Sequence, residues 1–235
     1  MKQPGHSRHG AGRDATRPLR FLLFDLDETL YPAQSGMFGE VGELIHRYMQ
    51  DRVGIPAGEV RQLRRLYYER YGTTLRGLQI HYQVDPEDYL TYVHDVDASS
   101  FIRPNPALER ALGDLPQKKV IFTNATADHA WNVLRALGIS HHFQRIFDIR
   151  ALRYYCKPDP MAYQIVLIGL PAAGPECLLV DDTLRNLRAG REAGMRTLWV
   201  GTEPCPQDGA DYCVTDIAQV RDAVRSLMEE SQEAR

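Results

Sequence analysis

The sequence predicts an α/β protein in which helices cover both faces of a doubly wound parallel sheet, with an all-helical cap domain inserted into it. Three observations support this prediction. Short apolar runs recur along the chain, helical patterns lie between them, and one long helical stretch interrupts the alternation. Strands that alternate with helices form βαβ units, and such units build a parallel sheet.

Four apolar runs are the expected strands. Each is short and continuous, which is typical of a strand buried on both faces of a parallel sheet. They are Leu19–Phe24, Lys119–Phe122, Cys177–Val180 and Arg196–Val200. Helical patterns over 128–137, 160–170 and 184–193 accompany these runs, and Gly138 and Gly194 stand where helices commonly end.

Residues 36–100 show helical patterns and no strand. Apolar residues recur at helical spacing from Val41 to Met49 and from Val60 to Tyr67. Asp85 followed by Pro86 predicts the start of a further helix, because Asp is a favoured N-cap and Pro a favoured first residue. The block is too long for a simple crossover between the first two strands, so we interpret it as an inserted cap.

These patterns divide the chain into three parts. We expect a core domain made of residues 19–34 and 101–235, and a helical cap domain at residues 35–100. Residues 1–18 are rich in Gly, Arg, His and Ser without a hydrophobic period, which predicts a disordered tail.

Composition excludes several classes of protein. The chain has 235 residues and a net charge of −3, which gives no electrostatic reason to expect a nucleic acid polymer or a membrane as partner. No apolar run approaches the ~20 residues of a membrane span. The cysteines form no CxxC pair and are unevenly spaced, which favours free thiols; they are Cys156, Cys177, Cys205 and Cys213. With an N-terminal segment that lacks the apolar stretch of a secretory signal, this predicts a cytoplasmic protein.

Acidic residues follow two of the expected strands. Asp25 and Asp27 come after the first run, and Asp181 and Asp182 after the third. In a parallel sheet these positions meet at the edge where ligands bind. A single Asp there is as well explained as a helix cap. Two acidic pairs would repel each other unless a cation neutralised them, and oxygen ligands favour Mg²⁺.

Polar residues complete this edge. Thr123 and Asn124 end the second run, where a hydroxyl and backbone N–H groups can hold a phosphate. Lys157 lies in Cys-Lys-Pro-Asp-Pro, and the chain otherwise uses Arg for most of its 28 basic residues. Taken singly, Thr123 could be an ordinary cap and Lys157 a solvated lysine. Together with the acids, they favour a phosphate site with a compact positive charge.

Four segments resemble, in order and spacing, the motifs of the haloacid dehalogenase-like (HAD) superfamily. They are Asp25-Leu-Asp27-Glu-Thr29-Leu-Tyr31, Phe122-Thr123-Asn124-Ala125, Lys157-Pro158 and Val180-Asp181-Asp182-Thr183. The insert after the first motif is similar to the superfamily's helical C1 cap. Glu28 departs from the Asn often found there, and Asn186 stands where many relatives carry an acid.

Three further segments resemble the pyrimidine 5′-nucleotidase branch of this superfamily. They are residues 67–72, residues 75–78 and residues 126–138, the last with His129. The resemblance implies a pyrimidine nucleoside 5′-monophosphate, UMP or CMP, as substrate. The cap offers aromatic faces and donors that can hold a planar base, Arg76 among them, and Asn124 stands beside Thr123 in the core; we expect both residues to bind substrate.

The resemblance implies a role for each residue of the site. Asp25 would attack phosphorus and form an aspartyl-phosphate, and Asp27 would act as general acid and base. Thr123 and Lys157 would stabilise charge on the phosphoryl oxygens. Asp25, Asp181, Asp182 and the backbone carbonyl of Asp27 would hold Mg²⁺. We therefore expect a Mg²⁺-dependent phosphatase for a small phosphate monoester.

Other functions are compatible with the same sequence pattern. Within the superfamily these are a phosphatase for another metabolite such as a sugar phosphate, a phosphomutase, or a dehalogenase, which uses the first Asp without a metal. A response-regulator receiver also combines acids, a hydroxyl and a lysine, but its phosphorylated Asp follows the third strand. Here the Asp25-Leu-Asp27 motif follows the first strand, and a cap intervenes.

Overall fold

The computed structural model describes residues 17–201, 205 and 209–233. Most of the predicted tail, residues 1–16, lies outside them. Six strands form one sheet in the order β3-β2-β1-β4-β5-β6, and every neighbouring pair is parallel. The strands are β1 (Phe21–Phe24), β2 (Lys118–Phe122), β3 (Phe143–Phe147), β4 (Cys177–Asp181), β5 (Arg196–Val200) and β6 (Tyr212–Val214). The prediction of a parallel α/β sheet is confirmed.

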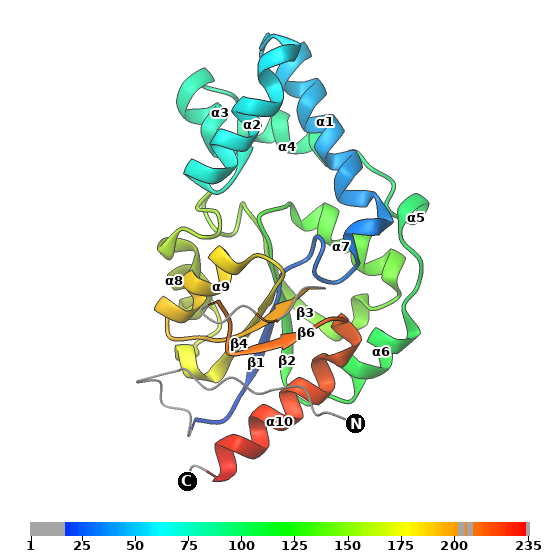
Figure 1. Ribbon diagram of the computed structural model, residues 1–235, viewed down its shortest axis with the longest axis vertical. Coiled ribbons are helices and arrows are strands. Elements are labelled where there is room, and N and C mark those ends of the chain that lie inside the picture. Colours follow the sequence, from blue (N-terminus) through cyan, green and yellow to red (C-terminus); the bar gives the residue numbers. More distant parts are fainter. Residues whose placement is uncertain (1–16, 202–204, 206–208, 234–235) are drawn as a thin grey trace.

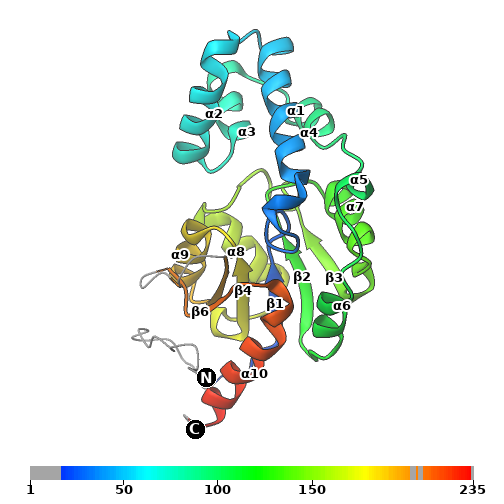
Figure 2. The ribbon, with the colours of Figure 1, turned by 45° about the vertical axis from the view of Figure 1, so that its right-hand side comes forward.

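Helices cover both faces of the sheet (Figures 1 and 2). On one face Leu22 and Phe24 of β1 belong to the same apolar cluster as α6 (Pro106–Gly113), α7 (Ala127–Leu137) and α10 (Val220–Glu233). On the other face Phe21 and Leu23 belong to the cluster that contains α8 (Pro160–Gly169) and α9 (Leu184–Glu192). Successive residues of a strand point to opposite faces, so this alternation makes the sheet doubly wound.

The two strands that the sequence did not predict, β3 and β6, are the edges of the sheet. β3 exposes Gln144 and Arg145 in its centre, and β6 has only three residues. Edge strands are often short and carry polar side chains, because one side of their backbone meets no further strand. Neither segment therefore shows the continuous apolar run of a central strand.

Four helices between β1 and β2 stand together beyond the carboxyl edge of the sheet (Figure 2). They are α1 (Met37–Asp51), α2 (Ala57–Tyr71), α3 (Thr74–Tyr82) and α4 (Pro86–Val93). The inserted helical block is thus present. Asp85 caps α4 as predicted, since its carboxylate accepts hydrogen bonds from the N–H groups of Glu87 and Asp88. The short α5 (Ala98–Phe101) leads back to the core.

The cap has an apolar centre of its own, which includes Ile45, Met49 and Tyr67. α3 packs closely on α2 because Gly77 leaves room for the Tyr67 ring: a Cβ at Gly77 would come within 2.2 Å of that ring. The Tyr67 ring also stacks on His81, with centroids 5.3 Å apart. The sequence did not predict α3 as a separate helix.

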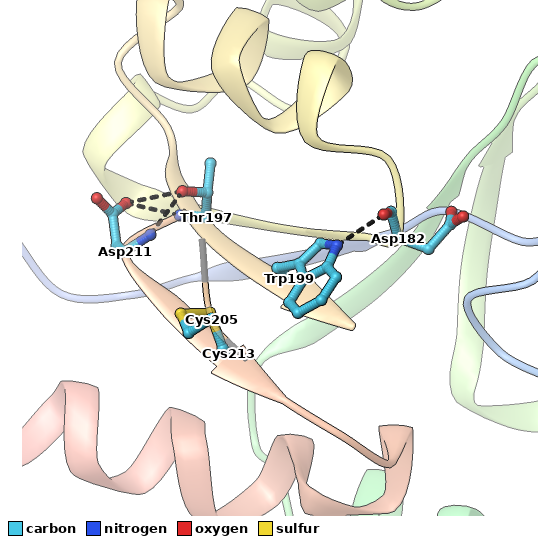
Figure 3. The surroundings of a disulfide bond; sticks show 6 residues. All are labelled: Asp182, Thr197, Trp199, Cys205, Asp211 and Cys213. Carbon is cyan, nitrogen blue, oxygen red and sulfur yellow. Dashed lines mark hydrogen bonds between the residues drawn. A yellow bond between two sulfur atoms is a disulfide. The ribbon is translucent and has the colours of Figure 1, made fainter. Parts of the chain in front are cut away.

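The prediction of four free thiols is wrong. Cys205 and Cys213 form a disulfide beside β5 and β6 (Figure 3), while Cys156 and Cys177 are free and buried. β6 pairs with β5 and holds Cys213 opposite Trp199, so the chain that returns from β5 brings Cys205 within reach. A separation of eight residues does not by itself predict such a contact.

Across the described ranges, the structure offers no helix with the length and apolar character needed to cross a membrane.

Candidate active site

The predicted acids meet where the strand order changes direction. β1 lies between β2 and β4: strands β2 and β3 follow on one side of β1, and strands β4, β5 and β6 follow on the other side. Ligands of such sheets bind at this place, outside the carboxyl ends of the strands. Phe24 is in register with Val180, and the Asp25 N–H donates to the Val180 carbonyl at 2.9 Å. Asp25 and Asp181 are therefore neighbours at the edge.

Lys157 lies at the centre of this group. Its Nζ is 2.9 Å from Asp25 Oδ1 and 2.7 Å from Asp181 Oδ2, and its side chain is only 1% exposed. Burial alone would lower the pKa of Lys157, but Asp181 and Asp25 outweigh burial and raise that pKa. The lysine therefore carries a positive charge beside Asp25, while its predicted contact with phosphoryl oxygens stays a prediction.

Asn124 fixes the loop that carries Lys157. Its Nδ2 donates to the Lys157 carbonyl at 3.1 Å, and its Oδ1 accepts from the Lys157 N–H at 2.7 Å. Both polar atoms of the Asn124 amide are thus engaged with the chain, although the residue also lines the cavity described below. Its predicted contact with substrate stays a prediction.

Asp181 is buried among hydrogen-bond donors. Its two oxygens accept from Lys157 Nζ, from the Thr183 N–H at 2.8 Å and from Asn186 Nδ2 at 3.1 Å. Asn186 therefore donates to Asp181, where a carboxylate in its place would repel it. With its oxygens engaged in this way, Asp181 is best suited to hold Lys157 in place.

Three carboxylates could bind a cation. Asp25, Asp181 and Asp182 each offer an oxygen, and these oxygens lie within 4.8 Å of one another. Burial raises the pKa of Asp25 well above its ordinary value, and burial together with Asp181 raises the pKa of Asp182 to about 7. A divalent cation would favour the ionised forms of both, so the residues fit a hard metal ion.

Asp182 is held by three neighbours, of which the Thr183 hydroxyl makes the longest contact, donating to Asp182 Oδ2 at 3.5 Å. The Thr29 hydroxyl donates to Asp182 Oδ1 at 3.1 Å and accepts from the Asp182 N–H at 3.1 Å. Trp199 Nε1 donates to the Asp182 carbonyl at 2.7 Å (Figure 3). The carboxylate keeps capacity for a further partner, in contrast to Asp181. Sequence reasoning assigned no role to Thr29 or Trp199.

Asp27 is oriented from one side only. Its Oδ1 accepts a hydrogen bond from Tyr31 at 2.6 Å and lies 2.9 Å from His129 Nε2. No partner of Asp27 Oδ2 is found among the described residues. Burial alone would raise the pKa of Asp27, but His129 and Tyr31 hold it below its ordinary value. Behind His129 lies His94, whose ring is 4.7 Å away and whose pKa burial lowers to about 3.

Thr123 closes the site at the end of β2. It is 1% exposed, and its hydroxyl accepts a hydrogen bond from the Ala125 N–H at 3.0 Å. The hydroxyl hydrogen stays available for an anion. The structure brings Asp25, Asp27, Thr123 and Lys157 together at this edge. The sequence analysis gave Tyr31 and His94 no role: the partner of Tyr31 is Asp27, only four residues away, whereas those of His94, Thr126 and His129, come from a distant segment.

A cavity of about 500 Å³ extends from these residues to the cap. Asp25, Asp27 and Lys157 line it on the side of the sheet, and residues of α1, α2 and α4 line it on the other side. Arg76 is exposed on α3 and is not among the lining residues, so its contact with substrate stays a prediction. Arg61 and Arg64 of α2 line the cavity, and the sequence analysis did not select them.

Known proteins share this architecture. Residues 19–194 match the family described as haloacid dehalogenase-like hydrolase, so the chain belongs to that family. The protein is thus an enzyme of the HAD hydrolase superfamily.

Two curated relatives are similar in sequence. Phosphate metabolism protein 8 of Saccharomyces cerevisiae is 26% identical over 192 residues, which are 75% of this chain and 60% of that protein. Phosphoserine phosphatase of Thermus thermophilus is 30% identical over 104 residues, 43% of this chain and 41% of that protein. The matched parts thus cover less than two thirds of either relative.

Solved structures agree on the fold. L-2-haloacid dehalogenase from Xanthobacter autotrophicus, with chloropropionic acid covalently bound, has a TM-score of 0.59 at 16% identity, covering 88% of this chain and 98% of that one. YfnB from Bacillus subtilis, bound to magnesium, has a TM-score of 0.58 at 18% identity, covering 88% and 99%. At these identities the likeness concerns the fold alone.

Proposed function

We propose that the protein is a Mg²⁺-dependent phosphomonoesterase that transfers the phosphoryl group to Asp25 and then to water. The observation that carries this proposal is the ammonium group of Lys157, 2.9 Å from Asp25 Oδ1. It places a buried positive charge beside the proposed nucleophile, where a phosphate would bring further negative charge. Phosphoryl transfer depends mainly on such positioning and electrostatic stabilisation.

In the first step the Asp25 carboxylate attacks phosphorus and forms an aspartyl-phosphate, while the bond from phosphorus to the ester oxygen breaks. Lys157 and the Thr123 hydroxyl stabilise the negative charge on the phosphoryl oxygens. Asp27 donates the proton that the leaving oxygen needs; because His129 and Tyr31 lower the pKa of Asp27 in the free enzyme, this role requires that the negative charge of the bound phosphate raises that pKa. Tyr31 and His129 engage Asp27 Oδ1, which leaves Oδ2 for this transfer.

In the second step water attacks the phosphorus of the aspartyl-phosphate. Asp27, now ionised, accepts the proton of that water, and the bond between phosphorus and Asp25 breaks. Phosphate leaves, Asp25 is again a carboxylate, and Asp27 again holds a proton. Asp27 therefore acts as the general acid in the first step and as the general base in the second.

Asp25 and Asp182 are the proposed side-chain ligands of Mg²⁺, with the backbone carbonyl of Asp27. Asp181 belongs to the same acidic group, but its oxygens face Lys157, Thr183 and Asn186. Bound there, Mg²⁺ supplies positive charge that offsets the carboxylates and the phosphate.

Dehalogenases share the fold, so the reaction has to be argued from the site. Two features support phosphate over a halogenated acid. Asp27 is a second acid beside the nucleophile with one oxygen free for proton transfer, and Asp182 gives Asp25 a partner for a metal. A dehalogenation requires neither feature.

For the substrate we propose a pyrimidine nucleoside 5′-monophosphate, supported by the resemblance at residues 67–72 and 75–78. Tyr68 lines the cavity and could stack on a base, although the Arg185 guanidinium already lies 3.6 Å from its ring centroid. Tyr67 packs inside the cap, and Tyr71 shares a hydrogen bond with His81.

The variant Arg76→Ala tests the predicted contact between Arg76 and the substrate. A loss of about 10-fold in the turnover of UMP, with little loss on p-nitrophenyl phosphate, would support that contact.

The deciding experiment is a panel of phosphate monoesters assayed by released phosphate, with Mg²⁺ and with EDTA. We expect hydrolysis only with the metal, and UMP and CMP ahead of sugar phosphates. Activity unaffected by EDTA would contradict the metal-dependent mechanism and favour the hypothesis that the protein is a dehalogenase. Sugar phosphates ahead of UMP and CMP would reject the nucleotide and leave the phosphatase mechanism in place.

A cytoplasmic location also stays a proposal. It is supported by the two free, buried thiols of Cys156 and Cys177. The disulfide between Cys205 and Cys213 weakens that argument, since disulfides are uncommon in reducing compartments.

A further inference from the structure

One wall of the cavity is basic and comes from a single helix. Arg61, Arg64 and Tyr68 of α2 all line the cavity. They are three and four residues apart in sequence, which places them on one face of a helix. Arg65, which follows Arg64 in the sequence, lines the cavity as well. The basic wall therefore stands across the cavity from the proposed phosphate site.

Two of these arginines lack an acidic partner. Arg65 is paired with Glu69 at 2.8 Å, whereas no ion pair among the described residues includes Arg61 or Arg64. Arg64 Nη1 donates to the Gly42 carbonyl at 3.2 Å and lies 3.1 Å from His46 Nε2. Neither contact brings a negative charge to the guanidinium.

The surroundings of Arg64 favour an anion in the cavity. Arg64 is half-buried, so its guanidinium has lost part of its contact with water, and this burial lowers its pKa. A partly desolvated charge is costly unless an opposite charge compensates it. Glu43 partly offsets this effect of burial on the pKa of Arg64, but its carboxylate is paired with His46 Nδ1 at 3.4 Å and forms no ion pair with Arg64. An anionic ligand could therefore offset the charge of Arg64.

The wall has a defined position relative to the phosphate site. The C-terminal end of α2 is attached to the core, because Arg185 donates to the carbonyls of Tyr68 and Gly72. Arg64 and Arg61 lie about 6 and about 10 Å further along the helix axis than Tyr68, away from the sheet. Apolar residues such as Ile45 and Leu90 line the space as well.

We propose that Arg61 and Arg64 bind a second anionic group of the substrate. The preferred substrate would then be a phosphate monoester whose leaving group carries a carboxylate or a second phosphate, separated from the ester by an apolar or ring-shaped spacer. The guanidinium fork suits both anions, because it can donate two parallel hydrogen bonds to either. This proposal rests on the proposed phosphomonoesterase function and deepens it: a pyrimidine nucleotide with an additional anionic group satisfies both.

The test uses compounds that differ in one charge. We would measure kcat/KM with Mg²⁺ for 4-carboxyphenyl phosphate and for its neutral analogue, 4-carbamoylphenyl phosphate, by released phosphate. The wild type should prefer the carboxylate by about 10-fold or more, which corresponds to about 1.4 kcal/mol. Benzene-1,4-diyl bisphosphate, in the same assay, shows whether a second phosphate is preferred over a carboxylate.

Three variants assign the preference to its residues. Arg61→Gln and Arg64→Gln should each bring the ratio of the charged to the neutral compound close to one. Arg70→Gln is the matched control, because it removes the same charge from the same helix at an exposed residue that does not line the cavity, and it should keep the ratio. The Arg61 side chain is exposed and makes no hydrogen bond among the described residues, so Arg61→Gln tests the proposal even if Arg64→Gln fails to fold.

The outcomes separate the two proposals. Hydrolysis of both compounds without a preference, or a preference that all three variants keep, would overturn the anion subsite and leave the phosphomonoesterase intact. An equal loss of preference in Arg70→Gln would mean that net charge on α2 acts at a distance, which also overturns the subsite. No hydrolysis of any phosphate monoester would reject the proposed function and this inference with it.

Discussion

A buried lysine between two carboxylates distinguishes the roles of the acids in this site. Lys157 contacts Asp25 and Asp181, yet only Asp181 is surrounded by further donors. Asp181 is therefore best understood as the partner that keeps Lys157 charged and in place, whereas Asp25 keeps the capacity to react. Asp182 remains the acid best placed to share a metal with Asp25.

Substitutions of the first two acids should separate nucleophile from acid and base. Asp25→Asn should abolish turnover, because an amide can neither attack phosphorus nor offer a charged oxygen. Asp27→Asn should lose most of the rate but keep metal binding, which uses the backbone carbonyl of that residue. Released phosphate measures the first effect and calorimetric titration with Mg²⁺ the second. Full activity of Asp25→Asn would contradict the mechanism.

The raised pKa of Asp182 predicts that metal binding depends on pH. Below about pH 7 the carboxyl group holds a proton, which the metal has to displace. The apparent dissociation constant for Mg²⁺ should therefore rise as pH falls, by about five-fold from pH 7 to pH 6 for one proton. Titrations with Mg²⁺ at both pH values measure it. A constant that does not change between them would show that Asp182 is already ionised without the metal.

At the scale of elements, the sequence predicted the buried strands well and the exposed edges poorly. β1, β2, β4 and β5 are continuous apolar runs because both of their faces are covered. β3 and β6 form only through pairing with a neighbouring strand, and this pairing cannot be predicted from the residues of β3 and β6 themselves. The same holds for the site. Residues at strand ends were predicted, whereas His94 and the arginines of α2 depend on how distant segments pack.

The contact between α2 and α3 provides a test of packing in the cap. Gly77→Ala should lower the melting temperature by several degrees, because the added Cβ would overlap the Tyr67 ring and overpacking costs roughly 1–3 kcal/mol. Gly58→Ala is the matched control, since nothing lies within 4 Å of a Cβ at that position of α2. It should be neutral or slightly stabilising, because Ala favours helices more than Gly. Equal effects of both variants would show that α3 can shift away from Tyr67.

At the scale of the whole molecule, several contacts among the described residues join the cap to the core, and two of them involve charged side chains. Arg185 of α9 reaches the C-terminal end of α2, with its guanidinium 3.6 Å from the centroid of the Tyr68 ring. On α4, Glu87 is paired with Arg150 of the core at 2.7 Å. Because the cavity lies between cap and core, these contacts also determine its width.

Removal of the first contact should loosen one side of the cap. In Arg185→Met we expect faster hydrogen–deuterium exchange at residues 68–75 and little change at α4, where the pair of Glu87 and Arg150 remains. Arg188→Met, an exposed residue on the same helix, is the control and should match the wild type. Unchanged exchange in Arg185→Met would mean that other contacts suffice to hold α2.

The hydrogen bond from Trp199 to the Asp182 carbonyl makes the protein report optically on its own site (Figure 3). Indole emission is sensitive to the charges near its ring nitrogen, and this nitrogen lies 2.7 Å from the backbone of a proposed metal ligand. The chain has two tryptophans, so Trp131→Phe leaves Trp199 as the single emitter. Addition of Mg²⁺ should then shift or quench the emission in a saturable way, and Asp182→Asn should remove that response. Occupancy of the site could thus be followed by fluorescence without any substrate or added dye.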